Sequence, residues 1–258
     1  MHMLKQYLDL YFYAADGIIF INKALGKESC AMSLFSSGVL NALYQVLIRL
    51  VVAVTALPVH EFAHGYVAYR LGDDTAKQMG RLTLNPLRHF DPFGTTMMLL
   101  TGFGWAKPVP VNASRFKNPK NGMALTAVAG PLANLLLAFI SMIGYKVVYW
   151  SATLGGGASS VTSVLANIFM IMLSINVSLA AFNLLPIPPL DGSRVASVLL
   201  PQEAYFKLMK AERVIMVLLF IAMFWGILDK PLGYIRNFAV GILDWATRPV
   251  DMIFKIFL

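Results

Sequence analysis

His60 and His64 are the two residues of this 258-residue chain whose type and spacing most directly suggest chemistry. They frame the segment His60-Glu61-Phe62-Ala63-His64, and residues four apart lie on one face of a helix. Both imidazoles could therefore hold one Zn²⁺, with Glu61 beside the metal as a candidate general base for hydrolysis. A pattern of this length also arises by chance on ordinary helices, so the interpretation needs a third ligand from elsewhere in the chain.

The chain around this motif has the composition of a membrane protein. Hydrophobic residues make up 58% of it and charged residues only 13%, and its mean hydropathy is +0.66, well above that of soluble proteins. A charged side chain at the centre of a bilayer costs roughly 2.5 to 3.5 kcal/mol, so ionisable residues among apolar neighbours are candidates for function. Cys30 is the only cysteine, which leaves histidines and carboxylates as the available zinc ligands.

The apolar segments predict an all-α polytopic membrane protein. The first helix is expected over about 39–70, which exceeds the roughly 20 residues needed to cross a bilayer. Further spans are expected at 123–150 and 161–185, with a marginal one at 214–228. We predict a bundle of about four to six transmembrane helices, with a re-entrant or short-strand segment near the candidate active site.

Pro58 stands just before the histidine motif in the first predicted helix. A proline has no backbone N–H, so it cannot donate a hydrogen bond to the carbonyl of Val54. We therefore predict a kink or a local loosening of the helix next to His60.

Three segments between the first two spans are too short or too polar to cross a membrane. Residues 72–92 form a turn-rich surface loop, in which weak alternation over 79–84 suits a short strand. Residues 93–105 contain three glycines and are expected to dip into the membrane and return, or to pack beneath the bundle. The proline-interrupted stretch 106–112 reads as an edge strand that could pair with a peptide, or as a rigid connector.

The net charge of +8 is expected to set membrane orientation, not to bind nucleic acid, because the basic residues fall mainly in short loops beside apolar spans. The chain is predicted to be a multi-pass protein of the cytoplasmic membrane. The loop 106–121 carries four basic residues and no acidic one, which predicts that this loop lies on the cytoplasmic side. Loop 151–160 then lies outside, and the candidate active site faces the cytoplasmic side. The oligomeric state is left open.

Three parts of the chain are distinguished by these patterns. Residues 1–38 form an N-terminal extension that could lie at the membrane interface, and residues 39–228 form the membrane-embedded core. Residues 229–258 space charges among aromatic residues, so this C-terminal tail is expected to be amphipathic and interfacial and not to span.

Asp191 is the best candidate for a third zinc ligand. It is a lone acid at the end of the apolar, proline-rich run 184–192. Irregular backbone of this kind is tolerated at membrane depth only where it is buried in protein or lines a cavity. An aspartate after prolines is also an ordinary helix N-cap, and the chemistry of the residue alone leaves both interpretations open.

Two separated motifs resemble the site-2 protease family of intramembrane zinc metalloproteases, peptidase family M50. They are His60-Glu61-Phe62-Ala63-His64 and the segment Asn183-Leu184-Leu185-Pro186-Ile187-Pro188-Pro189-Leu190-Asp191-Gly192. The segments 80–87, 103–112 and 129–134 also resemble a compact prokaryotic branch of that family. The similarity covers about residues 39–228.

The resemblance implies a role for each residue of the two motifs. His60, His64 and Asp191 would bind one Zn²⁺ per chain, and Glu61 would act as the catalytic acid and base that takes a proton from water and gives it to the leaving amine. Asn183 would lie near the scissile carbonyl and could donate to the developing oxyanion. From the residues alone, an interhelical hydrogen bond is an equally good interpretation of Asn183.

Substrate contacts are predicted with less specific signals. Asn134 could contact substrate or pack between helices, and packing is favoured. An unwound substrate could add to the stretch 106–112 through backbone hydrogen bonds, with Val109 and Val111 at its centre. His89 has no partner at ligand spacing and is expected to make a structural loop contact.

The resemblance therefore implies a zinc-dependent endopeptidase that cleaves single-span membrane proteins within the lipid bilayer. Two alternatives belong to other classes: a zinc-binding membrane scaffold without turnover, and a metal-ion transporter. A scaffold does not need Glu61 beside the metal. A transporter would need several ionisable groups on successive spans, and the spans 123–150 and 161–185 hold only Lys146.

Overall fold

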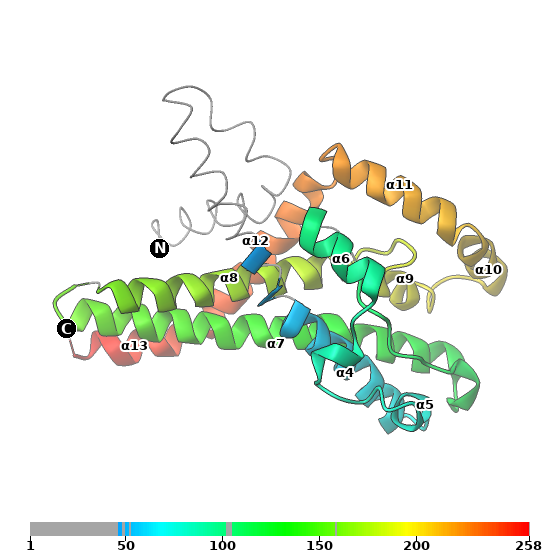
Figure 1. Ribbon diagram of the computed structural model, residues 1–258, viewed down its shortest axis with the longest axis horizontal. Helices are drawn as coiled ribbons and strands as arrows, with labels where there is room; N and C mark the ends of the chain where they lie inside the picture. Colours follow the sequence, from blue (N-terminus) through cyan, green and yellow to red (C-terminus); the bar gives the residue numbers. More distant parts are fainter. Residues whose placement is uncertain (1–45, 48–49, 52, 102–104, 158, 258) are drawn as a thin grey trace.

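The computed structural model describes residues 46–47, 50–51, 53–101, 105–157 and 159–257 (Figure 1). The described residues are helical and contain no strand. The whole predicted N-terminal extension, residues 1–38, and the start of the first predicted helix lie outside them. The elements are α4 (Ala56–Arg70), α5 (Thr75–Gln78), η1 (Pro86–Arg88), α6 (Pro92–Thr101), η2 (Ala113–Arg115), α7 (Pro119–Leu154), α8 (Ser160–Asn183), α9 (Asp191–Ala196), α10 (Gln202–Lys210), α11 (Glu212–Phe224), α12 (Asp229–Ala246) and α13 (Arg248–Lys255).

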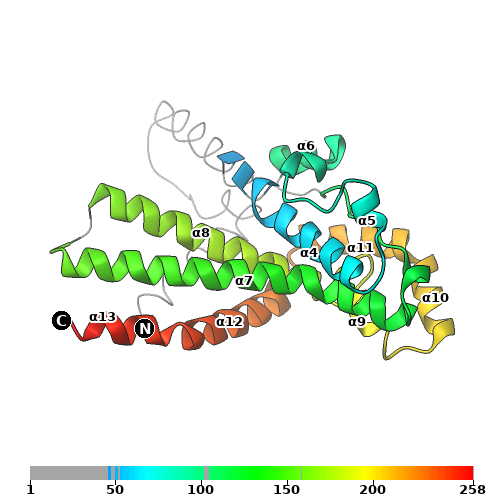
Figure 2. The same cartoon turned by 90° about the horizontal axis from the view of Figure 1, so that it is seen from below.

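Helices α7 and α8 form a long antiparallel hairpin that carries the rest of the structure (Figures 1 and 2). The Asn118 side chain accepts a hydrogen bond from the backbone N–H of Asn121 at the start of α7, and Ser159 and Thr162 form a capping box at the start of α8. α7 has 36 residues and α8 has 24, and both are apolar enough to cross a membrane. Only 39% of each apolar window is buried, so most of this surface faces outward, unlike the core helix of a soluble protein.

The count of four to six spans stays a prediction, because α7 and α8 alone meet the criteria of length and hydropathy among the described residues. The marginal span expected at 214–228 contains α11, which has 13 residues and is shorter than the roughly 20 needed to cross.

α4 lies across the first half of α7 and carries the histidine motif (Figure 2). The predicted loosening near Pro58 is confirmed. Residues 53 and 54 are helical, Thr55 is a turn, and α4 begins at Ala56. The Thr55 hydroxyl donates to the carbonyl of Val51 over 2.6 Å, which binds the two parts of the helix together at the interruption.

The connection between α4 and α7 differs from the prediction in one respect. The short strand expected over 79–84 is wrong, because these residues form turns around α5, with the backbone N–H of Arg81 donating to the carbonyl of Ala76 over 2.8 Å. α6 has ten residues, roughly 15 Å of helix, so it cannot span, as expected. Residues 105–112 are extended but pair with no strand in the described part of the chain; we call this segment the strap.

The C-terminal helices α12 and α13 run alongside the α7–α8 hairpin towards the loop that joins α7 to α8 (Figures 1 and 2). Val240 and Leu243 of α12 pack with Ala138 and Met142 of α7 and with Met170, Leu173 and Val177 of α8. A second apolar cluster, made of Leu185, Leu190 and Leu219, joins the segment before α9 to α11. The two clusters hold the hairpin, the C-terminal helices and the Asp191 region in one arrangement.

Candidate metal centre

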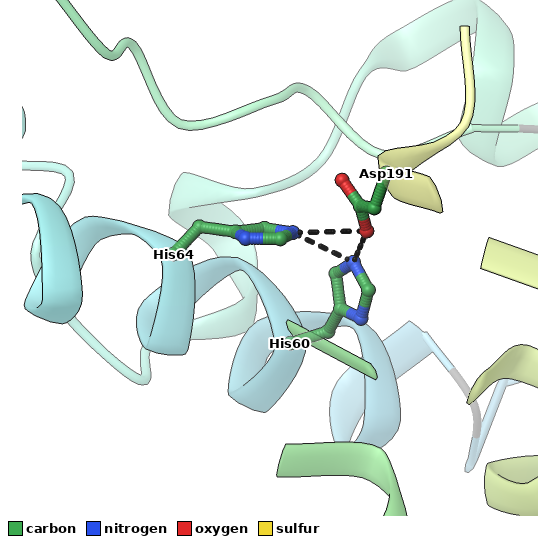
Figure 3. A group of neighbouring side chains, drawn as sticks. All are labelled: His60, His64 and Asp191. Carbon is green, nitrogen blue, oxygen red and sulfur yellow. Dashed lines mark hydrogen bonds and ion pairs between the residues drawn. The ribbon is translucent and has the colours of Figure 1, made fainter. Parts of the chain in front are cut away.

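His60, His64 and Asp191 come together although more than a hundred residues separate the histidines from the aspartate (Figure 3). The Nε2 atoms of the two histidines are 2.9 Å apart. Asp191 Oδ2 lies 3.2 Å from Nε2 of His60 and 3.3 Å from Nε2 of His64. Both histidines are buried, and the aspartate side chain is 16% exposed. One helix thus supplies two imidazoles, and the first residue of another supplies a carboxylate.

The other nitrogen of each imidazole is held by a neutral acceptor on α7. Nδ1 of His60 lies 2.6 Å from Oδ1 of Asn134, and Nδ1 of His64 lies 2.7 Å from the carbonyl oxygen of Thr126. A carbonyl oxygen can only accept, so both Nδ1 atoms carry the proton. In the neutral rings, both Nε2 atoms then present a lone pair to the space beside Asp191.

The arrangement fits a cation. Two imidazole lone pairs and a carboxylate oxygen face one another, and Asp191 Oδ2 is buried without a hydrogen-bond partner. Two ligands of one tetrahedral zinc ion, each about 2.0 to 2.1 Å from it, lie about 3.3 Å apart. The separations of 2.9, 3.2 and 3.3 Å are close to that value. His60, His64 and Asp191 could therefore hold zinc.

The chain before α9 directs Asp191 towards the histidines. Leu185 and Leu190 are buried in the second apolar cluster, and the intervening run contains the cis peptide bond Pro188–Pro189. The N-cap interpretation of Asp191 is wrong: Leu190 is the N-cap of α9, and Asp191 is its first helical residue.

Asn134 is fully buried and its side chain is held at both ends. Its Oδ1 faces His60, and its Nδ2 donates to Oδ1 of Asn176 over 3.0 Å. Asn176 in turn donates to the carbonyl of Met172 over 2.8 Å. This chain of hydrogen bonds fixes which way the Asn134 amide points, and through it the orientation of His60. A contact of Asn134 with substrate stays a prediction.

Gly130 is a residue of the site to which the sequence alone assigns no role. A Cβ atom at this position would lie 2.5 Å from Nε2 of His64 and 2.6 Å from Cε1 of His60. Any side chain here would therefore displace the imidazoles. The signal in the sequence is the segment Ala129-Gly130-Pro131 inside an otherwise regular apolar helix.

Glu61 is not one of the three candidate metal ligands. Its side chain contacts the strap. Its Oε2 accepts a hydrogen bond from the backbone N–H of Val109 over 2.8 Å. Val109 is buried against α4, where a Cβ added to Gly65 would meet its Cγ1 at 3.1 Å. The carboxylate of Glu61 is thus held beside the histidine pair by backbone from another segment.

The strap is tied down along its length. The N–H of Lys107 donates to the carbonyl of His89 over 2.8 Å, Arg81 donates to the carbonyl of Lys107 over 2.7 Å, and the N–H of Asn112 donates to Asp73 Oδ2 over 2.6 Å. The prediction of a structural loop contact for His89 is confirmed, since its Nε2 lies 2.8 Å from the carbonyl of Thr83. The strap therefore lies over α4 in a defined position.

Asp73 anchors the last residue of the strap. Burial alone would raise the pKa of its carboxyl, but hydrogen bonds from Thr75 and from the backbone N–H of Asn112, together with Arg115, hold that pKa below its ordinary value. The carboxylate therefore stays charged and accepts these hydrogen bonds at neutral pH.

The remaining predicted residues are placed as follows. The side chain of Asn183 donates to the carbonyl of Leu179 within α8 over 3.0 Å, so its role at an oxyanion stays a prediction. Val111 is half-buried in the strap, and substrate binding by Val109 and Val111 stays a prediction.

The site combines two histidines and a glutamate on one helix with an aspartate from a distant segment. In a bundle of apolar helices, these residues define a candidate metallohydrolase of the membrane. The model of peptidase family M50 matches residues 46–226. The chain belongs to this family, and the family predicted from its two motifs is confirmed.

The similar proteins agree with this assignment. The chain is 46% identical over 167 residues to the Bacillus subtilis (strain 168) protein named "Putative zinc metalloprotease YwhC", which covers 65% of this chain and 74% of that protein. It is 30% identical over 142 residues to a Mycolicibacterium smegmatis protein named "Putative zinc metalloprotease Rip2", covering 53% of this chain and 51% of that one. No solved structure matches.

Proposed function

We propose that this protein is a zinc-dependent intramembrane endopeptidase that cleaves transmembrane segments of single-span membrane proteins. The observation that carries the proposal is the meeting of two imidazole lone pairs and a buried carboxylate oxygen beside Glu61. Membership of peptidase family M50 and the names of the relatives support a zinc metalloprotease. The apolar helices α7 and α8 support a location in a membrane.

The chemistry divides among the residues of the site. His60, His64 and Asp191 would hold one zinc ion, which supplies Lewis acidity that makes water deprotonate near neutral pH and polarises a peptide carbonyl. Glu61 takes the proton from water and later donates it to the leaving amine nitrogen. Asn134 keeps the proton of His60 on Nδ1, so that Nε2 remains a ligand; we propose this positioning role in place of a substrate contact.

The strap suggests how a substrate is presented. A peptide bond within a helix is hidden by its own hydrogen bonds, so a spanning substrate must unwind locally before cleavage. The strap lies over the motif helix in an extended conformation, with Val109 bonded to Glu61. An unwound substrate would add its backbone beside the strap, and Asn183 would face the carbonyl under attack.

The active site is proposed to face the cytoplasm. Lys117 and Lys120 lie at the start of α7, on the side of the metal group, and the loop between α7 and α8 has no charge. Basic loops are retained on the cytoplasmic side of a multi-pass protein of the cytoplasmic membrane.

Purified protein in detergent, loaded with zinc and incubated with a panel of single-span membrane proteins, tests the proposal. We expect cleavage by the natural protein and a loss of about 10² to 10⁴ in rate for Glu61→Gln, with the zinc content unchanged. Glu203→Gln, a matched change at an exposed glutamate on α10, should cleave normally. Zinc binding without cleavage of any substrate would favour the scaffold, and equal cleavage by the Glu61→Gln form would contradict the proposed role of Glu61.

The substrate pathway has its own test. Val111→Pro removes one backbone N–H from the strap without touching the hydrogen bond between Val109 and Glu61. Proteolysis should then slow while zinc content stays normal. Val109→Pro also removes the donor to Glu61 and should be slower still. Unchanged turnover in Val111→Pro would remove the strap from the substrate pathway.

A further inference from the structure

The C-terminal helices α12 and α13 lie beyond the residues matched by the family model. Their exposed surface is rich in apolar side chains. Large apolar and aromatic side chains at helical spacing point outward along their whole length. Tyr234 is 76% exposed, Phe238 71%, Trp245 65% and Ile253 57%. An amphipathic helix on a water-soluble surface would have these residues inside.

Arg236 of the same helices is buried, and Asp244 and Asp251 are half-buried and turned towards α7. The exposed charged residues stand at the ends of the helices: Asp229 and Lys230 begin α12, and Arg248 and Lys255 are the first and last residues of α13. Lys146 of α7 is buried, and its Nζ lies 2.9 Å from Oδ1 of Asp244 and 2.6 Å from Oδ2 of Asp251. The indole N–H of Trp150 donates to the other oxygen of Asp251 over 2.8 Å. Polar groups inside a helix group and apolar groups outside are the arrangement expected in lipid, where ionisable side chains face the bundle and pair with one another.

The two helices also follow the hairpin from the region of the metal group to the loop that joins α7 to α8 (Figures 1 and 2). At the start of α12, Leu232 and Ile235 pack on Leu185 and Leu190, next to the aspartate of the metal group. Further on, Asp244 and Asp251 meet Lys146, which lies sixteen residues beyond Gly130 on α7, roughly 24 Å along its axis. Figures 1 and 2 show α12 and α13 following the hairpin to the end where α7 and α8 are joined.

We propose that α12 and α13 together form a transmembrane element whose outer face contacts the hydrocarbon chains of the bilayer. The two helices cover residues 229–255, roughly 40 Å of helix, which suffices to cross. The C-terminus then lies on the membrane face opposite to Asp191. This replaces the interfacial position predicted for the tail, and it rests on the membrane location of α7 and α8 in the proposed function.

Lipid, and not a second copy of the chain, is the occupant that the neighbouring surfaces favour. The exposed side chains of α7 and α8 beside the tail are apolar as well: Leu136 and Ile140 on α7, and Val161, Val164 and Ile168 on α8. Apolar surface thus continues from the exposed face of α12 onto α7 and α8. A dimer contact would need one apolar face and leave the others polar.

Labelling of single cysteines in whole cells tests the position of the C-terminus. Cys30→Ser removes the only natural cysteine. Separate chains then carry Phe257→Cys at the C-terminus, Leu154→Cys at the end of α7, or Lys117→Cys before its start, all exposed positions. With a membrane-impermeant maleimide, Phe257→Cys and Leu154→Cys should react from outside, and Lys117→Cys only after permeabilisation. Reaction of Phe257→Cys together with Lys117→Cys would overturn the proposal.

The lipid contact is tested with a fluorophore on Phe238→Cys in vesicles that contain lipids brominated in their acyl chains. Strong quenching by these lipids and weak quenching by aqueous iodide are expected. Efficient cross-linking of two copies through Phe238→Cys, with no quenching by brominated lipid, would overturn the choice of lipid. A chain that cleaves substrate through Glu61 but labels Phe257→Cys inside would refute this inference alone, whereas recovery of the protein in the soluble fraction would refute both proposals.

Discussion

The two ends of α7 both bury polar groups, but they use them differently. At the metal end, where α7 meets α4 and α9, neutral acceptors hold the Nδ1 atoms of the two imidazoles, and three atoms that can bind a metal face one another. At the distal end, where α7 meets α12 and α13, each carboxylate faces a donor, Lys146 or Trp150. Buried polarity alone therefore does not identify a functional site. A candidate functional site is indicated where several acceptor atoms converge and no donor group faces them.

The difference also separates chemistry from architecture. The metal end is assembled from close approaches: Gly130 allows α7 to pass under the histidines. At the distal end, the buried ammonium group of Lys146 holds the helices together, and the aromatic side chains of α12 are exposed. Lys146 was the one ionisable group of the two predicted spans, and its ion pairs with the tail remove it from consideration as part of a transport path.

Gly130→Ala is expected to have the largest effect of the substitutions that distinguish the metal end of α7 from its distal end. The new Cβ would lie 2.5 Å from Nε2 of His64, so the imidazoles must move and the metal site is lost. We expect a fall in zinc affinity of at least about 100-fold and loss of cleavage, with helical content unchanged. Competition with a chelator measures the affinity.

Gly241→Ala on α12 is the matched control, because nothing lies within 4 Å of its added Cβ. It should bind zinc normally and gain slightly in stability, since alanine is favoured over glycine in helices. Normal zinc binding by Gly130→Ala would show that the histidines do not need this close approach.

The distal end is tested by Lys146→Met, which leaves Asp244 and Asp251 without their cation. Removing one partner of a buried ion pair costs about 3 to 5 kcal/mol, and the partly exposed aspartates place the effect at the lower end of that range. The thermal midpoint should fall while each folded chain still binds zinc. Lys120→Met, at the exposed start of α7, should have little effect.

A coupled substitution sharpens this test. Asp251→Asn in the Lys146→Met chain should recover part of the lost stability, because one uncompensated charge disappears. Independent, additive losses would contradict an ion pair between these residues.

The metal ligands could be predicted from the sequence because their chemistry is local. Histidines four apart share a helix face in any context, and an aspartate in an apolar run needs a partner. The all-helical hairpin was predictable for the same reason, since length and hydropathy are properties of each segment. Gly130 could not be placed, because its role depends on where α4 crosses α7.

The wrong strand prediction over 79–84 has a physical cause. Six residues of weak alternation over 79–84 are too few to separate a strand from a series of turns, and Gly80 has a positive φ of 63° that suits a turn. Periodicity in the tail revealed two faces but not which one is inside. Only the contacts of Asp244 and Asp251 with Lys146 supply that information.

Asn134→Leu tests the hydrogen-bond chain at the metal end with a smaller expected effect. The leucine keeps the volume but offers no acceptor to Nδ1 of His60, so zinc affinity should fall by about 10- to 100-fold. Asn176→Leu acts only through Asn134 and should weaken binding less. Ser141→Ala, a buried polar position seven residues further along α7, is the control. Equal zinc affinity in all three chains would contradict the positioning role.

The smallest effect concerns Asp73, which anchors Asn112, the last residue of the strap. Its pKa is lowered in the folded protein, so the stabilisation is present above the ordinary value of 3.8 and is lost as the pH falls through the lowered value. Asp73→Asn should cost about 1 kcal/mol at neutral pH, because the N–H of Asn112 loses a charged acceptor. Unfolding followed from pH 7 downward should show this difference shrinking in acid. Asp74→Asn weakens only exposed contacts, with Arg115 and Gln78, and should change little at any pH. A constant difference for Asp73→Asn would mean that the carboxylate charge does not hold the strap.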